Sequence, residues 1–258
     1  MSTTTTNDYI LPNASPQIVE AETYEPISAE AVSLTNPRSM ASEQYRVLRY
    51  RLEILAKQGV KALAFTSAQS GEGKTTTAVN AALALGRGRR NKVVLVDADL
   101  RHPGVHTMLG LKPREGLCDI VAGRASLGSC LWQFGKDELY VLPAGNVPDD
   151  LGDTLYNERL GQVLGELKER FDFVLLDCPP VLPLADVPTL CRDLDGAIVV
   201  VRAGSTAREM VGAAVDALFG IPVHGMVLND VDPRAATMLN LGSSGEAPKA
   251  LMPYRAVR

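Results

Sequence analysis

The sequence lacks most of the features that mark secreted, membrane-spanning or disulfide-bonded proteins. Its four cysteines (Cys118, Cys130, Cys178 and Cys191) show no C-x-x-C spacing, which favours buried, reduced thiols over disulfides or a cysteine zinc site. No apolar run is long enough to span a bilayer, and the N-terminus MSTTTTNDYI lacks the basic and apolar regions of a signal peptide. We therefore expect a cytoplasmic chain without direct membrane insertion, so any association with a membrane must come through a partner.

An excess of basic residues is absent as well. The formal net charge is -4, and residues 1–38, which contain five acidic residues against Arg38 alone, account for all of it. The remaining chain is neutral and does not provide the basic surface that a nucleic-acid-binding protein needs. The sequence therefore argues against nucleic acid as a partner.

What the sequence does contain is a succession of short apolar strands and amphipathic helices within residues 39–240. With 258 residues, 46% of them hydrophobic and 22% charged, the chain can bury a sizeable core. The fold we expect is α/β, a doubly wound, mainly parallel sheet flanked by helices. Residues 1–38 are rich in Thr, Ser, Pro and Glu and predict a disordered acidic tail, and residues 241–258 predict a mobile C-terminal tail.

The chain is organised around the segment KALAFTSAQSGEGKTTTAVNAALAL at residues 61–85. An apolar run, a glycine-containing turn and an alanine-rich helical pattern form the strand, loop and helix of a phosphate-binding loop. Gly71 and Gly73 let the backbone approach a polyphosphate, Lys74 adds a positive charge, and the Thr75 hydroxyl can bind a Mg²⁺ ion that bridges the outer phosphates. We expect the loop and first helical turn to contact the nucleotide through Gly71, Glu72, Gly73, Lys74, Thr75 and Thr76.

Carboxylates follow two other predicted buried strands, and the carboxyl ends of such strands border the ligand crevice of open α/β sheets. The strand KVVLVD leads into DADLRHP, so Asp97 and Asp99 lie two residues apart and face the same side of an extended segment. Together they suit Mg²⁺ coordination and proton abstraction from a hydroxyl, although Asp99 could instead cap the following turn. Asp177 ends the strand FDFVLLD and is the expected partner of Thr75 and Mg²⁺, with Asp186 as a lesser candidate.

Two weaker patterns leave alternatives open. Asn229 ends the last predicted strand, where it could contact an adenine edge or simply form a turn. His102 and His106 have the spacing of a metal-binding pair on a helix, but no third ligand is evident and Pro103 lies between them, so a zinc site is disfavoured.

Taken together, TSAQSGEGKTTTAVN, VVLVDADLRHP, FDFVLLDCPPVLPLAD and the upstream EQYRVLR closely resemble the bacterial tyrosine kinases of capsular and exopolysaccharide biosynthesis. The likeness spans roughly residues 40–232 and includes GLCDIVAG and VLPAG. It implies a P-loop ATPase fold in which Lys74 and Thr75 belong to Walker A, Asp97 and Asp99 to the variant Walker A′, and Asp177 to Walker B. The resemblance also implies an ATP- and Mg²⁺-dependent kinase that regulates polysaccharide polymerisation and export with a membrane co-polymerase at the inner membrane.

Two further expectations come from this resemblance. Glu43, Arg46 and Arg49 match the family's E-x-x-R-x-x-R motif, which mediates assembly into rings. Kinases of the family carry a C-terminal cluster of tyrosines as autophosphorylation sites, and here Tyr254 is the single candidate in the C-terminal tail.

Two alternatives stay open. Septum-site and plasmid-partition ATPases share the deviant Walker fold but use a second lysine near the start of the loop, where this chain has Gln69. A catalytically weak regulator, in which ATP switches assembly with the co-polymerase, is favoured by the single tail tyrosine and opposed by the complete set Lys74, Asp97, Asp99 and Asp177.

Overall fold

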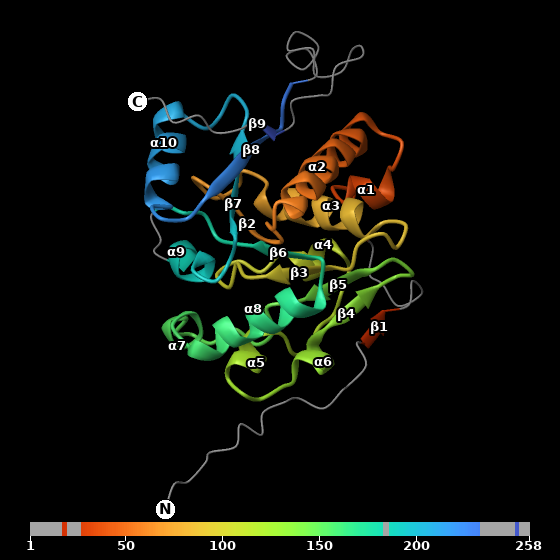
Figure 1. Ribbon diagram of the computed structural model, residues 1–258, viewed down its shortest axis with the longest axis vertical. Helices are drawn as coiled ribbons and strands as arrows, with labels where there is room; N and C mark the ends of the chain where they lie inside the picture. The colour runs from red at the N-terminus through yellow and green to blue at the C-terminus, as the bar shows by residue number, and fades with distance from the viewer. Residues whose placement is uncertain (1–16, 20–26, 183–185, 233–250, 253–258) are drawn as a thin grey trace, which may run out of the picture.

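The structure is a computed structural model that describes residues 17–19, 27–182, 186–232 and 251–252 (Figure 1). Within these residues the strands form one nine-stranded sheet in the order β1-β4-β5-β3-β6-β2-β7-β8-β9. The strands are β1 (Gln17–Val19), β2 (Ala62–Ser67), β3 (Val93–Asp97), β4 (Trp132–Phe134), β5 (Leu139–Leu142), β6 (Phe173–Asp177), β7 (Gly196–Arg202), β8 (Val223–Asn229) and β9 (Leu251–Met252). The helices are α1 (Val32–Thr35), α2 (Met40–Lys57), α3 (Lys74–Gly86), α4 (Val105–Met108), α5 (Leu117–Val121), α6 (Leu127–Cys130), α7 (Gly152–Leu155), α8 (Glu158–Arg170), α9 (Asp186–Cys191) and α10 (Arg208–Ala217).

The centre of the sheet is parallel. β2 pairs with β6 and β7, and β3 pairs with β5 and β6, all in parallel register, while β4 with β5 and β8 with β9 are antiparallel pairs. Every residue of β2, β3 and β6 is buried, because helices cover both faces of the sheet. Such strands read as continuous apolar runs rather than as alternating patterns. The predicted doubly wound, mainly parallel α/β fold is therefore confirmed.

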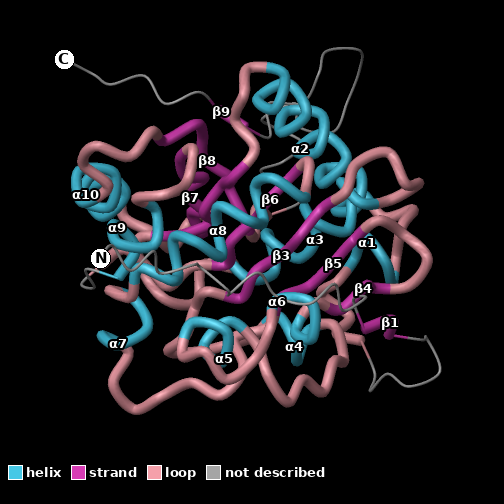
Figure 2. Tube along the Cα trace, turned by 60° about the horizontal axis from the view of Figure 1, so that its bottom comes forward, coloured by secondary structure: helices cyan, strands magenta, loops and turns pink. Residues whose placement is uncertain are grey.

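Helices form a layer on each side of this sheet (Figure 2). Leu48 and Leu52 of α2 pack with α3 and α4 against one face of the sheet, in a cluster that includes Leu63 and Phe65 of β2. Ala64 of the same strand points to the other face, which α5 to α10 cover. Leu52 is fully buried, and truncating such a side chain to alanine costs about 2–5 kcal/mol.

The two tails differ in part from the sequence-based expectation. β1 pairs with β4 at one edge of the sheet, and residues 27–38 contain α1 and pack on α3, with Ala31 fully buried. At residues 17–19 and 27–38 the chain is therefore structured, in contrast to the expected disordered tail. Leu251–Met252 form β9 beside β8, and the rest of the expected mobile tail, Tyr254 included, lies outside the described residues.

The pairing register aligns the carboxyl ends of three central strands. Asp177, the last residue of β6, is opposite Asp97 of β3 on one side and Phe65 of β2 on the other. The loops that follow these strands therefore meet at one edge of the sheet, where ligands bind in open α/β folds. Among the described helices, none combines the length and apolar character needed to cross a bilayer.

Candidate nucleotide-binding and phosphotransfer site

The loop between β2 and α3 leaves the start of a 13-residue helix open toward a cavity. Gly73 is the N-cap of α3, and both Gly71 (φ 80°) and Gly73 (φ 88°) adopt the left-handed conformation that favours glycine. A Cβ at Gly73 would overlap the side-chain amide of Asn229. Glycine thus allows the close approach of loop and strand end, and the free N–H groups and dipole of α3 create an anion-binding site.

A cavity of about 520 Å³ opens at this point. Seven of the residues expected at the nucleotide site line it: Gly71, Gly73, Lys74, Thr75, Thr76, Asp99 and Asn229. Five residues that the sequence analysis did not assign to the site also line it: Glu30, Ser70, His102, Arg202 and Asp230. The volume lies within the 300–1,000 Å³ range of small-molecule sites.

Lys74 and three carboxylates converge at the floor of the site. The Lys74 ammonium lies 3.5 Å from the Asp99 carboxylate, and both side chains are almost fully buried. Asp97 accepts a hydrogen bond of 3.1 Å from the N–H of Val105, the first residue of α4. Asp99 has two roles, because its second oxygen accepts the N–H of His102 at 3.2 Å. The two readings of Asp99 as a site carboxylate and as a turn cap are thus compatible.

The pKa values of Asp97 and Asp177 are raised, so the ionised form of both side chains is disfavoured in the site. Burial raises the pKa of Asp177 to about 7, although the Thr75 hydroxyl and the Lys74 charge both act to lower it. Burial and the neighbouring Asp177 hold the pKa of Asp97 well above its usual range, against the opposing effect of the Val105 N–H. Like charges in a low-dielectric interior disfavour ionisation, so this cluster is suited to a positive ion.

The residues present fit a magnesium ion. Three buried carboxylate oxygens, both of Asp177 and one of Asp97, lack a hydrogen-bond partner of good geometry among the described residues. No group of three or more His, Cys, Asp or Glu side chains within the described ranges is arranged to enclose a metal ion by itself. That is the usual situation for Mg²⁺, which takes one or two carboxylates and completes its shell with water and substrate phosphates.

Glu72 and Asn229 make contacts that their sequence positions alone do not reveal. Glu72 is 4% exposed, and its carboxylate accepts the Gln69 N–H at 3.1 Å and the Thr206 hydroxyl, so it braces the loop instead of facing the cavity. Asn229 donates from its side-chain amide to the carbonyl of Glu72 at 3.1 Å. The structure therefore brings Asn229 to the cavity as a loop contact.

The remaining candidates have local partners. Asp186 forms an ion pair of 2.7 Å with Arg101, in the loop after β3. His102 lines the nucleotide cavity, whereas His106 contacts the Thr107 hydroxyl at 3.2 Å, and partial burial lowers the pKa of His106. These two histidines belong to different surroundings, so they do not act as one pair.

The helix α2 carries the three residues of the expected assembly motif. Glu43 and Arg46 are exposed and form an ion pair of 2.5 Å, and Arg46 also donates to the carbonyl of Pro37 at 2.8 Å. Arg49 is half-buried and lies 3.7 Å from Glu53. Within one chain these charges are paired locally, and the exposed pair is available to a neighbouring molecule.

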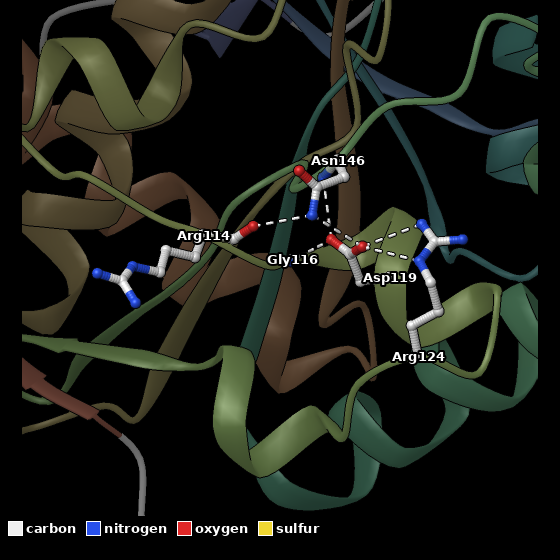
Figure 3. A network of polar contacts seen from close by, with 5 residues as sticks. All are labelled: Arg114, Gly116, Asp119, Arg124 and Asn146. Carbon is white, nitrogen blue, oxygen red and sulfur yellow. Dashed lines mark hydrogen bonds and ion pairs between the residues drawn. The ribbon is translucent and has the colours of Figure 1, made fainter.

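A second polar network, around Asp119, connects the GLCDIVAG segment to the VLPAG segment and the residue that follows it (Figure 3). Asp119 is 1% exposed and accepts the backbone N–H groups of Gly116 and Asn146 at 3.0 and 2.9 Å. It also accepts from the Asn146 amide at 3.1 Å and from the Arg124 guanidinium at 3.0 Å. Burial alone would raise the pKa of Asp119, but these hydrogen bonds lower it. The network joins α5 to the loop after β5 and has a structural role.

Comparisons with known proteins identify the family of this chain. A family model described as an AAA domain matches residues 39–216. The tyrosine-protein kinase YwqD of Bacillus subtilis (strain 168) is 34% identical over 188 residues, covering 72% of this chain and 79% of that protein. The tyrosine-protein kinase wzc of Salmonella typhi is 29% identical over 217 residues, and the chain spans 30% of its length.

Solved structures give the same result. The kinase domain of the Escherichia coli tyrosine kinase ETK superimposes with a TM-score of 0.76 at 27% identity, covering 88% of this chain and 89% of that one. The septum site-determining protein MinD of Pyrococcus horikoshii OT3, solved with Mg-ADP, gives a TM-score of 0.55 at 28% identity over 69% of this chain and 76% of that one. From the matched family model, the relatives and the shared fold, we conclude that the chain belongs to the bacterial tyrosine-protein kinases.

Proposed function

We propose that this chain is an ATP- and Mg²⁺-dependent protein-tyrosine kinase that regulates exopolysaccharide or capsule polymerisation and export. The observation that carries the proposal is the convergence of Lys74, Thr75, Asp97, Asp99 and Asp177 beside the open start of α3. A phosphate-binding loop accounts for nucleotide binding, and the adjacent carboxylates supply what transfer to a hydroxyl requires.

Each residue has a role in this proposal. Lys74 and the backbone N–H groups at the start of α3 hold the outer phosphates, where negative charge develops during transfer. Thr75, Asp97 and Asp177 hold Mg²⁺, and the orphaned oxygens of the two aspartates support this assignment. Bound Mg²⁺ supplies neutralisation of the phosphate charge. Asn229, whose amide also donates to the carbonyl of Glu72, is the proposed contact to an adenine edge.

In the transfer step the tyrosyl oxygen bonds to the γ-phosphorus, the bond from that phosphorus to the bridging oxygen breaks, and ADP departs. The phenolic proton passes to a carboxylate. Asp99 is the better candidate for this base, because it lines the cavity, whereas Asp97 is fully buried and already bound to the Val105 N–H. Asp99 also lies 3.5 Å from the Lys74 ammonium, so it is adjacent to the group that holds the outer phosphates.

The same proposal names the tyrosine that accepts the phosphate and the residues that form the ring of identical chains. Tyr254 is the candidate autophosphorylation site, and a ring of identical chains would present the tail of one chain to the site of its neighbour. Glu43, Arg46 and Arg49 on α2 supply the ring contacts, with the exposed charge of Glu43 and Arg46 in support. We propose a cytoplasmic location, peripheral to the inner membrane, through a membrane polysaccharide co-polymerase.

A second candidate is a catalytically weak regulator in which ATP binding switches assembly with the co-polymerase. The single tyrosine of residues 241–258 favours it, because repeated autophosphorylation has few acceptors there. A partition or septum-site ATPase is less well supported, since Gln69 stands where that family uses a second lysine.

The test is incubation of the purified chain with labelled ATP and Mg²⁺, alone and with the cytoplasmic segment of a co-polymerase. Phosphotyrosine that depends on Lys74 supports the kinase. ATP binding with co-polymerase association but without phosphotyrosine supports the regulator and contradicts the kinase. Hydrolysis without tyrosine transfer points to the ATPase.

A further inference from the structure

The segment of residues 27–36, here called the N-terminal strap, is fixed against α3 beside the nucleotide cavity. Its Ser33 N–H donates to the side-chain oxygen of Asn80 at 2.8 Å, and the Asn80 amide donates to the carbonyl of Glu30 at 2.9 Å. Asn80 is fully buried, as is Ala31 of the strap, and the Ser28 N–H donates to the carbonyl of Met108 at 3.0 Å. The strap backbone is thus held from two sides, independently of the Glu30 side chain.

This anchoring brings the Glu30 carboxylate to the wall of the cavity. The carboxylate accepts a hydrogen bond of 3.2 Å from the Thr76 hydroxyl, on the first turn of α3. The two aspartates of the cavity wall each form an ion pair, Asp99 with Lys74 and Asp230 with Arg202. Among the described residues, Glu30 forms no ion pair. A carboxylate has about four acceptor positions, so Glu30, which is exposed and lines the cavity, keeps acceptor capacity beyond its bond to Thr76.

The Glu30 carboxylate is a hydrogen-bond acceptor, so it can bind only those parts of a nucleotide that donate. The phosphates belong at Lys74 and the start of α3, and a carboxylate repels them. The hydroxyls of the ribose are donors, and they lie on the sugar that is bonded directly to the phosphate chain. Glu30 is attached to α3 at Thr76, two residues beyond Lys74, where the sugar follows the phosphates. An acidic side chain that accepts from a ribose hydroxyl is an established device in other nucleotide-binding folds.

We propose that Glu30 is a specificity-determining residue that accepts a hydrogen bond from a ribose hydroxyl and selects ribonucleotides over deoxyribonucleotides. This inference rests on the proposed function only in requiring that the cavity takes a nucleoside triphosphate. Selection of the sugar comes from the strap, which lies outside the phosphate-binding motifs.

Equilibrium titration of the full chain with ATP, 2′-deoxy-ATP and 3′-deoxy-ATP in the presence of Mg²⁺ tests the proposal. One hydrogen bond corresponds to about three- to ten-fold in affinity, so the wild type should bind at least one deoxynucleotide more weakly than ATP by that factor. Glu30→Ala should bind ATP more weakly and bring the ratio of ATP to deoxynucleotide affinity toward one, whereas Glu30→Gln, which keeps one acceptor oxygen, should retain part of the discrimination. Glu169→Gln on α8 removes the same charge from an exposed position remote from the cavity, so it should keep the wild-type ratio.

The outcomes separate the inference from the proposed function. Wild type that binds ATP through Lys74 but does not discriminate among the sugars overturns the role of Glu30 and leaves the nucleotide site intact. Equal tightening of all three nucleotides by Glu30→Ala also overturns it, because the carboxylate would then act by repelling phosphate. Failure of the wild type to bind ATP contradicts both. Thermal unfolding of each variant checks its fold, which should persist because Asn80 contacts the strap backbone.

Discussion

Replacing Asp177 by Asn is expected to stabilise the metal-free fold while it abolishes phosphotransfer. The two side chains have nearly the same shape, but only the carboxylate carries a charge into the interior. The carboxylate of Asp177 is fully buried without a hydrogen-bond partner of good geometry among the described residues. Lys74 and Thr75 compensate this buried charge only in part, so it opposes folding, and a bound cation removes the remaining penalty.

The magnitude follows from the pKa. Burial raises the pKa of Asp177 from 3.8 to about 7, and each pKa unit corresponds to about 1.4 kcal/mol, so ionisation costs the fold about 4 kcal/mol at most. The buried amide of Asn also lacks partners and costs about 1–3 kcal/mol. The net gain at pH 8 is therefore about 1–3 kcal/mol.

The sign of the pH dependence provides a second check. Between the unfolded and folded pKa values the folded chain binds more protons, so the stability of the wild type falls as the pH rises from about 4 to 7. Urea denaturation without Mg²⁺ should show the advantage of Asp177→Asn at pH 8 and little or none at pH 5. Asp216→Asn, an exposed position on α10, is the control and should change neither value. A less stable Asp177→Asn at pH 8, or the same difference at both pH values, would refute the reasoning.

Three further predictions concern other parts of the chain. Lys74→Met should lose ATP binding and transfer while circular dichroism stays unchanged, and transfer at the wild-type rate would remove Lys74 from the site. Replacement of Glu43, Arg46 and Arg49 by Ala should dissociate the ring in sedimentation with Mg²⁺ and nucleotide, whereas an unchanged oligomer distribution would mean that these charges only form a solvated surface. Asp119→Ala should lower the free energy of unfolding by about 1–3 kcal/mol in urea titrations because it leaves the buried Gly116 N–H without an acceptor, and a loss well below about 1 kcal/mol would show that the network is dispensable.

The sequence predicts those structural features that depend on consecutive residues. The phosphate-binding loop depends on consecutive residues, and the strands that end at Asp97 and Asp177 are continuous apolar runs of the kind found only where both faces are buried. Parallel pairing then brings their ends together, so the sheet and the convergence of Lys74 with Asp99 could be expected from spacing alone.

Features that depend on contacts between distant segments could not be derived in this way. Glu30 belongs to a stretch whose composition resembles a disordered tail, yet buried Asn80 on α3 fixes its backbone. Glu72 lies inside the loop motif, but its carboxylate contacts Thr206, 134 residues later. Arg202 lines the cavity because it ends β7, and its pairing with Asp230 has no signal in the local sequence.

The most direct test of the central claim is phosphotyrosine formation by the wild type and Asp99→Asn, measured by mass spectrometry with ATP, Mg²⁺ and an added tyrosine-containing polymer. The added polymer supplies an acceptor, so the result does not depend on Tyr254. If Asp99 accepts the tyrosyl proton, Asp99→Asn should still bind ATP and should form phosphotyrosine at least a hundred-fold more slowly, about the contribution of a general base. Wild type that binds ATP but forms no phosphotyrosine, or Asp99→Asn that forms it at the wild-type rate, would contradict the account.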